Sequence, residues 1–173
     1  RPGASVIYSQ RNESDKVEFV SGLLDGVTLG SPIGFFVKNS DQKSKDYSNY
    51  QDVFRPSHSD YTYESKYGIR DYKGGGRSSA RETVSWVVAG AIATQILSLK
   101  NIHIYSYVSA VGDIVLDQHY SELDLNSIYS NNVRCPSKNT SSMIESLISA
   151  CKKNGDTIGG HISTIIKGVP VGL

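Results

Sequence analysis

The stretch from Tyr67 to Thr83 reads Tyr-Gly-Ile-Arg-Asp-Tyr-Lys-Gly-Gly-Gly-Arg-Ser-Ser-Ala-Arg-Glu-Thr, and an apolar helical pattern follows it. The three consecutive glycines at positions 74–76 can adopt positive φ and allow a ligand to approach the backbone closely. Ser79 and Glu82 have the S-x-x-E spacing of a capping box, which marks a helix start. Free N–H donors at a helix start favour anions, and nearby arginines strengthen that preference. The stretch therefore predicts a glycine-rich turn that binds a phosphate or carboxylate.

The local charge also favours an anion. Six basic residues stand against three acidic ones between positions 55 and 81, a local charge of +3, whereas the whole chain carries +1. A nucleic acid would require a basic face over a much larger part of the chain. The expected partner is therefore a small-molecule anion and not a nucleic acid. RNA binding through the tyrosine-rich segment is the weaker alternative.

The composition is that of a soluble globular protein. A chain of 173 residues with 38% hydrophobic and 20% charged residues is long enough for one domain with a sizeable core. It has no apolar run near the ~20 residues of a membrane helix, so no membrane partner is expected. Cys135 and Cys151 lack metal-ligand spacing, and free thiols in a reducing cytoplasm are a simpler interpretation than a disulfide. His103, His119 and His161 form no metal-binding pattern, so no metal is expected.

Apolar periodicity and turn residues predict an α+β fold. The expected elements, in chain order, are a β-hairpin over 17–38 that turns at Asp25-Gly26, a loop over 39–52, an ordered functional loop over 54–76, a helix over 79–100 that stops at Asn101, a strand over 102–111, a helix over 139–153 capped by Gly155, and a strand over 162–166. Two of these elements should have a buried side. Tyr105 and Tyr107 are expected to pack within their strand, and the second helix should turn these side chains inward: Met143, Ile144, Leu147, Ile148 and Cys151.

An ordered series of short motifs runs through nearly the whole chain. Its core is Phe54-Arg-Pro-Ser-His-Ser-Asp-Tyr-Thr-Tyr63, then Lys66-Tyr-Gly-Ile-Arg-Asp-Tyr-Lys-Gly-Gly-Gly-Arg-Ser-Ser-Ala-Arg-Glu-Thr83 and Ala89-Gly-Ala-Ile-Ala93. The flanking motifs are Arg1-Pro-Gly3, Leu23-Leu-Asp-Gly-Val-Thr-Leu-Gly-Ser-Pro-Ile-Gly34, Asn39-Ser-Asp-Gln42, Asp46-Tyr47, Cys135-Pro136, Gly155-Asp-Thr-Ile-Gly-Gly160 and Gly168-Val-Pro-Val-Gly-Leu173. This series resembles the chorismate synthase family.

The resemblance implies a fold and an assembly. The family fold is a β-α-β sandwich with antiparallel sheets packed around helices, assembled as a homotetramer in the cytoplasm. Residues 1–173 would be the central part of a single chorismate-synthase-like domain. The family's N-terminal Gly-Glu-Ser-His-Gly segment and its C-terminal half do not appear in this sequence.

The resemblance also implies an activity. The family consists of carbon–oxygen lyases that eliminate phosphate from 5-enolpyruvylshikimate 3-phosphate to give chorismate, in the shikimate pathway of aromatic amino-acid biosynthesis. These enzymes need reduced FMN, and NADPH is a candidate reductant. The alternative is a non-catalytic fragment that binds a flavin or a phosphate and does not turn over.

His58 is the candidate catalytic residue, because the family's Arg-Pro-Gly-His motif has its catalytic histidine at this position. Imidazole titrates near neutral pH and is a common proton donor or acceptor. An ordinary loop histidine is the alternative interpretation. The family's glycine is replaced by Ser57, which is expected to alter the loop backbone slightly.

The other candidate residues match the family's ligand-binding positions. Those matching the flavin contacts are Arg77, Ser78 and Ser79, and those matching the substrate contacts are Arg81, Ala80 and Arg1. A cap serine and surface arginines are the alternative interpretation of this stretch. Two positions depart from the family pattern, since Val6 and Lys73 stand where arginines are usual.

Overall fold

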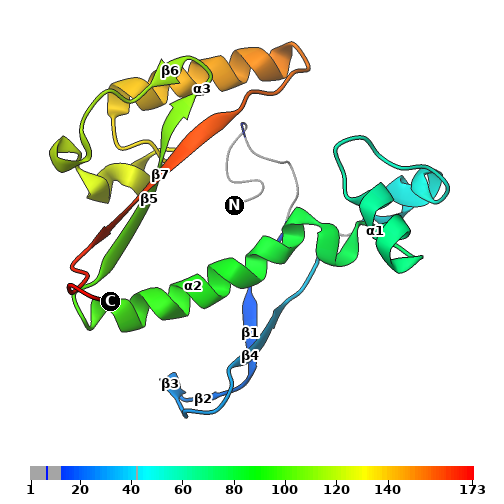
Figure 1. The fold of residues 1–173 in the computed structure, drawn as a ribbon, viewed down its shortest axis with the longest axis horizontal. Helices are drawn as coiled ribbons and strands as arrows, with labels where there is room; N and C mark the ends of the chain where they lie inside the picture. Colours follow the sequence, from blue (N-terminus) through cyan, green and yellow to red (C-terminus); the bar gives the residue numbers. More distant parts are fainter. Residues whose placement is uncertain (1–6, 8–12, 42) are drawn as a thin grey trace. The chain divides into compact units, whose positions relative to one another are not determined.

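The computed structural model describes residue 7 and residues 13–41 and 43–173. The chain forms two compact units, one of Arg11–Ile92 and one that joins Arg1–Gln10 to Ala93–Leu173 (Figure 1). Its elements are helices, short 3₁₀ turns and small antiparallel sheets, which confirms the α+β class. Among the described residues, no helix is both long enough and apolar enough to cross a bilayer.

The unit Arg11–Ile92 begins with the predicted hairpin. Its outer strands pair with each other and its inner strands pair across Asp25-Gly26; the four are β1 (Val17–Ser21), β2 (Leu23–Leu24), β3 (Val27–Thr28) and β4 (Gly34–Val37). Asp25 and Gly26 have φ of 50° and 80°, and two positive values are typical of a type I′ turn. The turn is therefore where the sequence predicted it.

A glycine divides the hairpin into its two strand pairs. Gly22 has φ of 82°, and a Cβ there would lie 2.7 Å from Ile33 Cα and from Pro32 O. Ser21 Oγ donates to Pro32 O at 3.1 Å and accepts from Gly34 N at 3.0 Å. The close approach at Gly22 explains why the expected continuous strand is broken there.

The segments on either side of position 54 contain more regular structure than the sequence predicted. A 3₁₀ turn, η1 (Ser44–Tyr50), lies in the expected loop over 39–52, and helix α1 (Asp60–Tyr67) lies in the expected loop over 54–76. Helix α1 is short, polar and rich in tyrosine, so it has no apolar stripe to reveal it. Its end is marked by Gly68, whose φ is 69° and whose N–H donates to Glu64 O at 2.8 Å.

The glycine-rich turn leads into the long helix, as predicted. Two 3₁₀ turns come first, and the elements in order are η2 (Gly76–Ser78), η3 (Ala80–Glu82) and α2 (Thr83–Ser98). Beyond α2, Asn101 has φ of 57° and donates to Ser98 O at 3.0 Å, while Ile102 N–H donates to Leu97 O at 3.0 Å. This pair of bonds is a Schellman motif, so Asn101 is confirmed as the helix stop.

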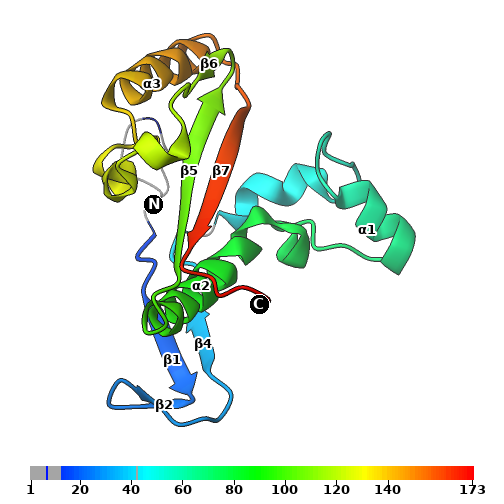
Figure 2. The ribbon, with the colours of Figure 1, turned by 60° about the vertical axis from the view of Figure 1, so that its left-hand side comes forward.

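The second unit contains a three-stranded antiparallel sheet in the order β6-β5-β7. The long strands β5 (His103–Val111) and β7 (Gly160–Lys167) run side by side, and β6 (Ile114–Val115) pairs with the end of β5 (Figure 2). Two short 3₁₀ turns, η4 (Tyr120–Glu122) and η5 (Leu125–Ser130), precede helix α3 (Lys138–Lys153). Ser137 caps the start of α3 and its Oγ accepts from Thr140 N at 3.3 Å, while Gly155 follows the end of the helix with φ of 69°.

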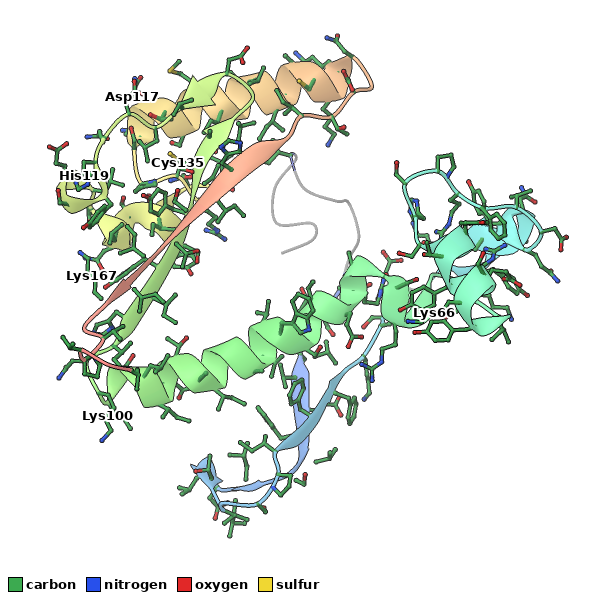
Figure 3. The ribbon with its side chains drawn as sticks, in the orientation of Figure 1. Lys66, Lys100, Asp117, His119, Cys135 and Lys167 are labelled. Atoms are coloured by element: carbon green, nitrogen blue, oxygen red, sulfur yellow. The ribbon has the colours of Figure 1, made fainter. Side chains whose placement is uncertain are left out.

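Two apolar clusters form the core of this unit. One is buried between β5 and α3 and consists of Val111, Val133, Cys135 and Ile144; the other consists of Tyr107, Leu125 and Ile128, with Tyr105 packed against it. Both cysteines are free, and the Cys135 side chain is completely enclosed (Figure 3). The packing predicted for the two tyrosines is confirmed. The expected inward turn of Met143 is wrong, because its side chain is half exposed.

Candidate functional site

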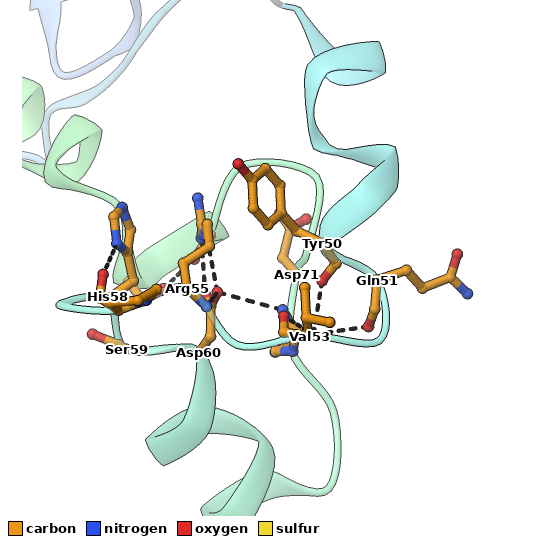
Figure 4. A network of polar contacts seen from close by, with 12 residues as sticks. Tyr50, Gln51, Val53, Arg55, His58, Ser59, Asp60 and Asp71 are labelled. Carbon is orange, nitrogen blue, oxygen red and sulfur yellow. Dashed lines mark hydrogen bonds and ion pairs between the residues drawn. The ribbon is translucent and has the colours of Figure 1, made fainter.

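His58 lies in the turn before α1 (Figure 4). Its Nδ1 is 2.8 Å from Pro56 O, and a carbonyl oxygen can only accept, so Nδ1 carries the proton in this contact. Neutral imidazole has one N–H, which leaves Nε2 as the basic nitrogen of an exposed side chain. The His58 N–H closes the turn by donating to Arg55 O at 3.3 Å. The turn therefore fixes one tautomer and leaves the other nitrogen available for proton transfer.

Ser57 occupies a glycine-like backbone conformation in the same turn. Its φ is 59°, in the left-handed region that L-residues with a Cβ disfavour. Glycine adopts such a positive φ easily, so the serine at this position is a residue with a Cβ in a region that favours glycine. The backbone of the turn is therefore strained at Ser57, and contacts of the neighbouring residues must stabilise this conformation.

A buried carboxylate holds the start of this turn. Asp60, 3% exposed, accepts three hydrogen bonds from Arg55: Oδ2 from the backbone N at 3.0 Å and from Nε at 2.8 Å, and Oδ1 from Nη2 at 2.8 Å. The hydrogen bonds from the Arg55 side chain hold the pKa of the Asp60 carboxyl well below its usual range. The same contact raises the pKa of the Arg55 guanidinium. Asp60 is therefore ionised whenever the loop is folded near neutral pH.

Arg70 holds the other side of the loop. Its Nη2 donates to three backbone carbonyls, those of Tyr50 and Gln51 at 2.8 Å and of Val53 at 3.0 Å. Its Nη1 and Nε lie 3.5 Å from Asp60 Oδ2 and 3.2 Å from Glu64 Oε2, in ion-pair contact without hydrogen-bond geometry. Arg55, Asp60 and Arg70 together are called the Asp60 clamp below. The clamp joins the chain before position 54 to helix α1.

The glycine-rich turn has the predicted conformation. Gly74, Gly75 and Gly76 have φ of 148°, 88° and 49°. Gly75 N–H donates to Asp71 O at 2.8 Å, and a Cβ on Gly76 would lie 3.1 Å from Asp71 Oδ2. Larger residues would therefore be strained at all three positions, and at Gly75 and Gly76 they would also be crowded.

Ser79 caps the second 3₁₀ turn, η3, although not as a capping box, while Ser78 belongs to the first turn, η2. Ser78 Oγ donates to Gly75 O at 2.6 Å, and Ser79 Oγ accepts from Arg81 N at 3.3 Å. In a capping box the Glu82 side chain would return to the Ser79 N–H, but that N–H donates to Gly76 O at 3.1 Å. The cap at Ser79 is confirmed, and the predicted role of Glu82 in it is wrong.

Arg77 and Arg81 each contact a carboxylate. Arg77 Nη1 is 2.9 Å from Glu82 Oε1, and the Arg77 side chain is 84% exposed. Arg81 Nη1 is 3.4 Å from Oε1 of Glu13, which is 8% exposed and accepts from the backbone N–H groups of residues 40 and 41 at 2.9 and 3.2 Å through Oε2. Any anion at this turn must compete with these two carboxylates.

The local charge of +3 therefore overstates the positive charge that is available to bind an anion. Arg55 and Arg70 belong to the Asp60 clamp, and the partners of Arg77 and Arg81 lie outside the window from position 55 to 81. A count along the sequence could not include Glu13, which lies 68 residues before Arg81. The turn still offers two guanidinium groups on its exposed side, each within reach of a carboxylate that a ligand anion could replace.

The candidate residues divide into two groups in the structure. The turn brings together Arg77, Ser78, Ser79, Ala80 and Arg81, while His58 lies in the loop that the clamp holds. Arg77 and Arg81 do not share one helical face, because Ser79 between them is extended, with φ of −77° and ψ of 143°. Arg1 and Val6 lie outside the described residues. Among the described residues, no cluster of three or more metal-ligating side chains is found.

Sequence reasoning missed Asp60, Arg70 and Glu13 as parts of the site. Arg55 and Asp60 have opposite charges five positions apart, a signal that could have suggested their pairing. Arg70 binds backbone carbonyls across a loop, and Glu13 pairs across 68 positions, so their contacts leave no local pattern.

A family model described as chorismate synthase matches residues 1–173, the whole chain. The chain belongs to the chorismate synthase family. Similar proteins include the chorismate synthases of Christiangramia forsetii, 55% identical, and of Flavobacterium psychrophilum and Bacteroides fragilis, each 54% identical. Each alignment covers 100% of this chain and 48% of the relative, so the chain spans about half the length of the curated relatives it matches.

A solved structure agrees with this family. A crystal structure of a chorismate synthase matches with a TM-score of 0.70 and 25% sequence identity, over 89% of this chain and 45% of that protein. The resemblance carried by the ordered motifs is therefore confirmed by sequence and by fold.

Proposed function

We propose that the protein containing this chain eliminates phosphate from 5-enolpyruvylshikimate 3-phosphate and forms chorismate, in the shikimate pathway. The observation that carries the proposal is membership of the chorismate synthase family over all 173 residues. The local chemistry supports it, because a substrate with one phosphate and two carboxylates requires cationic and N–H donors.

We propose the glycine-rich turn as the site for the phosphate of FMN. Arg77 is exposed, and the Ser79 hydroxyl accepts from Arg81 N but has no acceptor for its own proton among the described residues. The N–H groups of Gly76, Arg77 and Ala80 likewise have no acceptor in the described part of the chain. This donor set fits a phosphate, although Ser78 donates its hydroxyl proton to Gly75 O and would contribute only after rotating.

We assign the substrate anion to Arg81, with Ala80 beside it and Arg1 as a further contact. A guanidinium presents two parallel N–H groups to a carboxylate or a phosphate. Arg81 is 41% exposed and its contact with Glu13 is long, at 3.4 Å, so the guanidinium can turn toward a ligand.

His58 is proposed as the proton-transfer residue. Its Nε2 can accept a proton while Nδ1–H stays on Pro56 O, and the imidazolium can return that proton. By analogy with the family, the proton goes to the pyrimidine side of the reduced flavin. When bound, reduced FMN supplies the electronic assistance for loss of phosphate, and the chain's own residues supply orientation, charge and protons.

An anaerobic assay of the full-length protein tests the proposal. The protein is mixed with 5-enolpyruvylshikimate 3-phosphate and chemically reduced FMN, and chorismate and phosphate are measured together. Equal amounts of the two products are expected, with little product when FMN is oxidised or omitted. Binding of FMN without product would favour the non-catalytic alternative.

Separate titrations test the choice of nucleotide. FMN is expected to bind, whereas NADPH is expected only as a reductant, because the sequence has no G-x-G-x-x-G strand–turn–helix unit. Tight binding of NADPH without binding of FMN would contradict the assignment. We further propose that residues 1–173 form part of one domain of a homotetramer, which the sedimentation mass of the full-length protein would test.

A further inference from the structure

The exposed imidazole of His58 lies three positions after Arg55, whose backbone and side chain donate three hydrogen bonds to the Asp60 carboxylate. Arg55 is fixed twice by Asp60, through its backbone N–H at 3.0 Å and through both arms of its guanidinium at 2.8 Å. The carbonyl of the same Arg55 accepts the His58 N–H at 3.3 Å. The backbone of His58 is therefore hydrogen-bonded to the residue that Asp60 fixes.

The position of Pro56 O decides the tautomer of His58. The Nδ1–H bond to this carbonyl is 2.8 Å long and joins residues only two positions apart. Ser57, between them, must keep its unfavourable φ of 59° for the bond to form. A strained residue on an exposed turn persists only where its neighbours are fixed, and here Arg55 and Asp60 fix both flanks.

We propose that Asp60 is a positioning residue that sets the tautomer and direction of the His58 ring through Arg55. This inference rests on the proposed function in one respect only, namely that the His58 ring transfers a proton. Asp60 itself touches Arg55 and Arg70, and no contact joins it to the imidazole among the described residues. When the carboxylate is lost, the Ser57 backbone can relax and Nδ1 loses its carbonyl partner.

Nuclear magnetic resonance of the full-length protein, labelled with ¹⁵N on histidine rings, tests the inference without substrate or flavin. Under conditions where an imidazole is neutral, its ring ¹⁵N shifts report the tautomer. The His58 signals are identified by their absence from His58→Gln. Wild type is expected to show the Nδ1–H form, and Asp60→Asn a mixture that gains the Nε2–H form.

A matched control separates this effect from a general loss of charge. Glu64 lies one helical turn after Asp60 and contacts Arg70 but has no contact with Arg55. Glu64→Gln is expected to leave the His58 tautomer as in wild type. If Asp60→Asn does not fold, Arg55→Lys keeps the charge pair but removes the two-armed contact, and the same gain of the Nε2–H form is expected.

Turnover in a double-mutant cycle completes the test. Asp60→Asn is expected to lower kcat by roughly 10-fold, and to lower it no further when His58 is already alanine, because Asp60 acts through that ring. Equal losses in both backgrounds would mean that Asp60 acts on stability alone, and would overturn the inference. An unchanged Nδ1–H form in Asp60→Asn would overturn it as well. Wild-type turnover of His58→Ala would instead reject the proton-transfer role of His58 in the proposed function. The positioning role of Asp60 would then be decided by the tautomer measurement alone.

Discussion

Ile144 and Cys135 have no exposed surface and are enclosed by apolar neighbours, whereas the most enclosed side chain around His58 is the carboxylate of Asp60. The first pair lies in the unit with the β6-β5-β7 sheet, and the second region lies in the unit Arg11–Ile92. One region is stabilised by removal of apolar surface from water, and the other by hydrogen bonds to buried charges. The difference shows how a fold can provide a fixed scaffold and also an exposed loop with defined chemistry.

The two kinds of stabilisation respond differently to substitution and pH. Apolar burial has no titrating group, while a buried charge pair depends on the ionisation of both partners. The contacts of the candidate residues His58, Arg77 and Arg81 are also polar, but these side chains are exposed, and the buried charge pair beside them is that of Arg55 and Asp60.

Asp60→Ala is expected to have the largest effect on stability. It leaves the buried guanidinium of Arg55 unpaired, and breaking a buried pair in this way typically costs about 3–5 kcal/mol. Hydrogen exchange of the amides around residues 50–70 would measure the loss locally. Asp113→Ala, at an exposed acid in the other unit, is the control and should change stability by less than about 0.5 kcal/mol. A loss no larger than that of the control would show that the clamp is not what holds the loop.

Acid should weaken the same loop. The pKa of Asp60 is lower in the folded chain than its usual value of 3.8, so the carboxylate stabilises the fold fully above about pH 5. This contribution is lost progressively as the pH falls below about 4, and it should be absent at all pH values in Asp60→Ala. Amide exchange in residues 50–70, followed as a function of pH in both proteins, would reveal the difference.

Ile144→Ala tests the other side of the comparison. Removing this fully buried side chain should cost about 2–5 kcal/mol, depending on how far the cavity between β5 and α3 collapses. Denaturant unfolding would measure the loss, which should be the same at pH 4 and pH 7. A strong pH dependence of this loss would contradict the division into apolar and charged regions.

Arg81→Lys should affect ligand binding rather than the fold. The charge is kept and the two-armed contact is lost, so substrate affinity should fall by about 1–3 kcal/mol, the scale of a charged hydrogen bond. Calorimetric titration of the full-length variant with substrate and with FMN separately would measure this. A fall in FMN affinity with unchanged substrate affinity would reverse the roles assigned to Arg77 and Arg81.

Ser57→Gly should have the smallest effect and the opposite sign. Glycine accepts φ of 59° without strain, so the loop should gain about 0.5–1 kcal/mol. Thermal unfolding would detect the gain, with Ser65→Gly, inside the helix α1, as a control that should instead destabilise. Destabilisation by Ser57→Gly would mean that the serine side chain has a role of its own.

The sequence predicted the apolar region better than the charged one. The second helix, the strand after Asn101 and the stops at Asn101 and Gly155 were predicted from local patterns, and each is confirmed. Helix α1 has no apolar stripe, so its existence depends on tertiary contacts that periodicity does not encode.

The sequence predicted which residues belong to the candidate site better than it predicted how they are arranged. The glycines at 74–76 have the expected positive φ, because no other residue type fits there easily. The four-residue spacing of Arg77 and Arg81 would place them on one face of a continuous helix, but the extended Ser79 separates two short turns. The partner Glu13 could not be predicted, because it lies 68 positions from Arg81 and the contact depends on three-dimensional placement.

Turnover of the full-length His58→Ala variant, assayed with chemically reduced FMN, tests the central claim most directly. Loss of the proton-transfer group should lower kcat by ~10²-fold or more, while reduced FMN still binds and the melting temperature is unchanged. His103→Ala, at an exposed histidine in the other unit, should keep wild-type turnover. Wild-type turnover of His58→Ala across the pH range would contradict the account and reduce His58 to an ordinary loop residue.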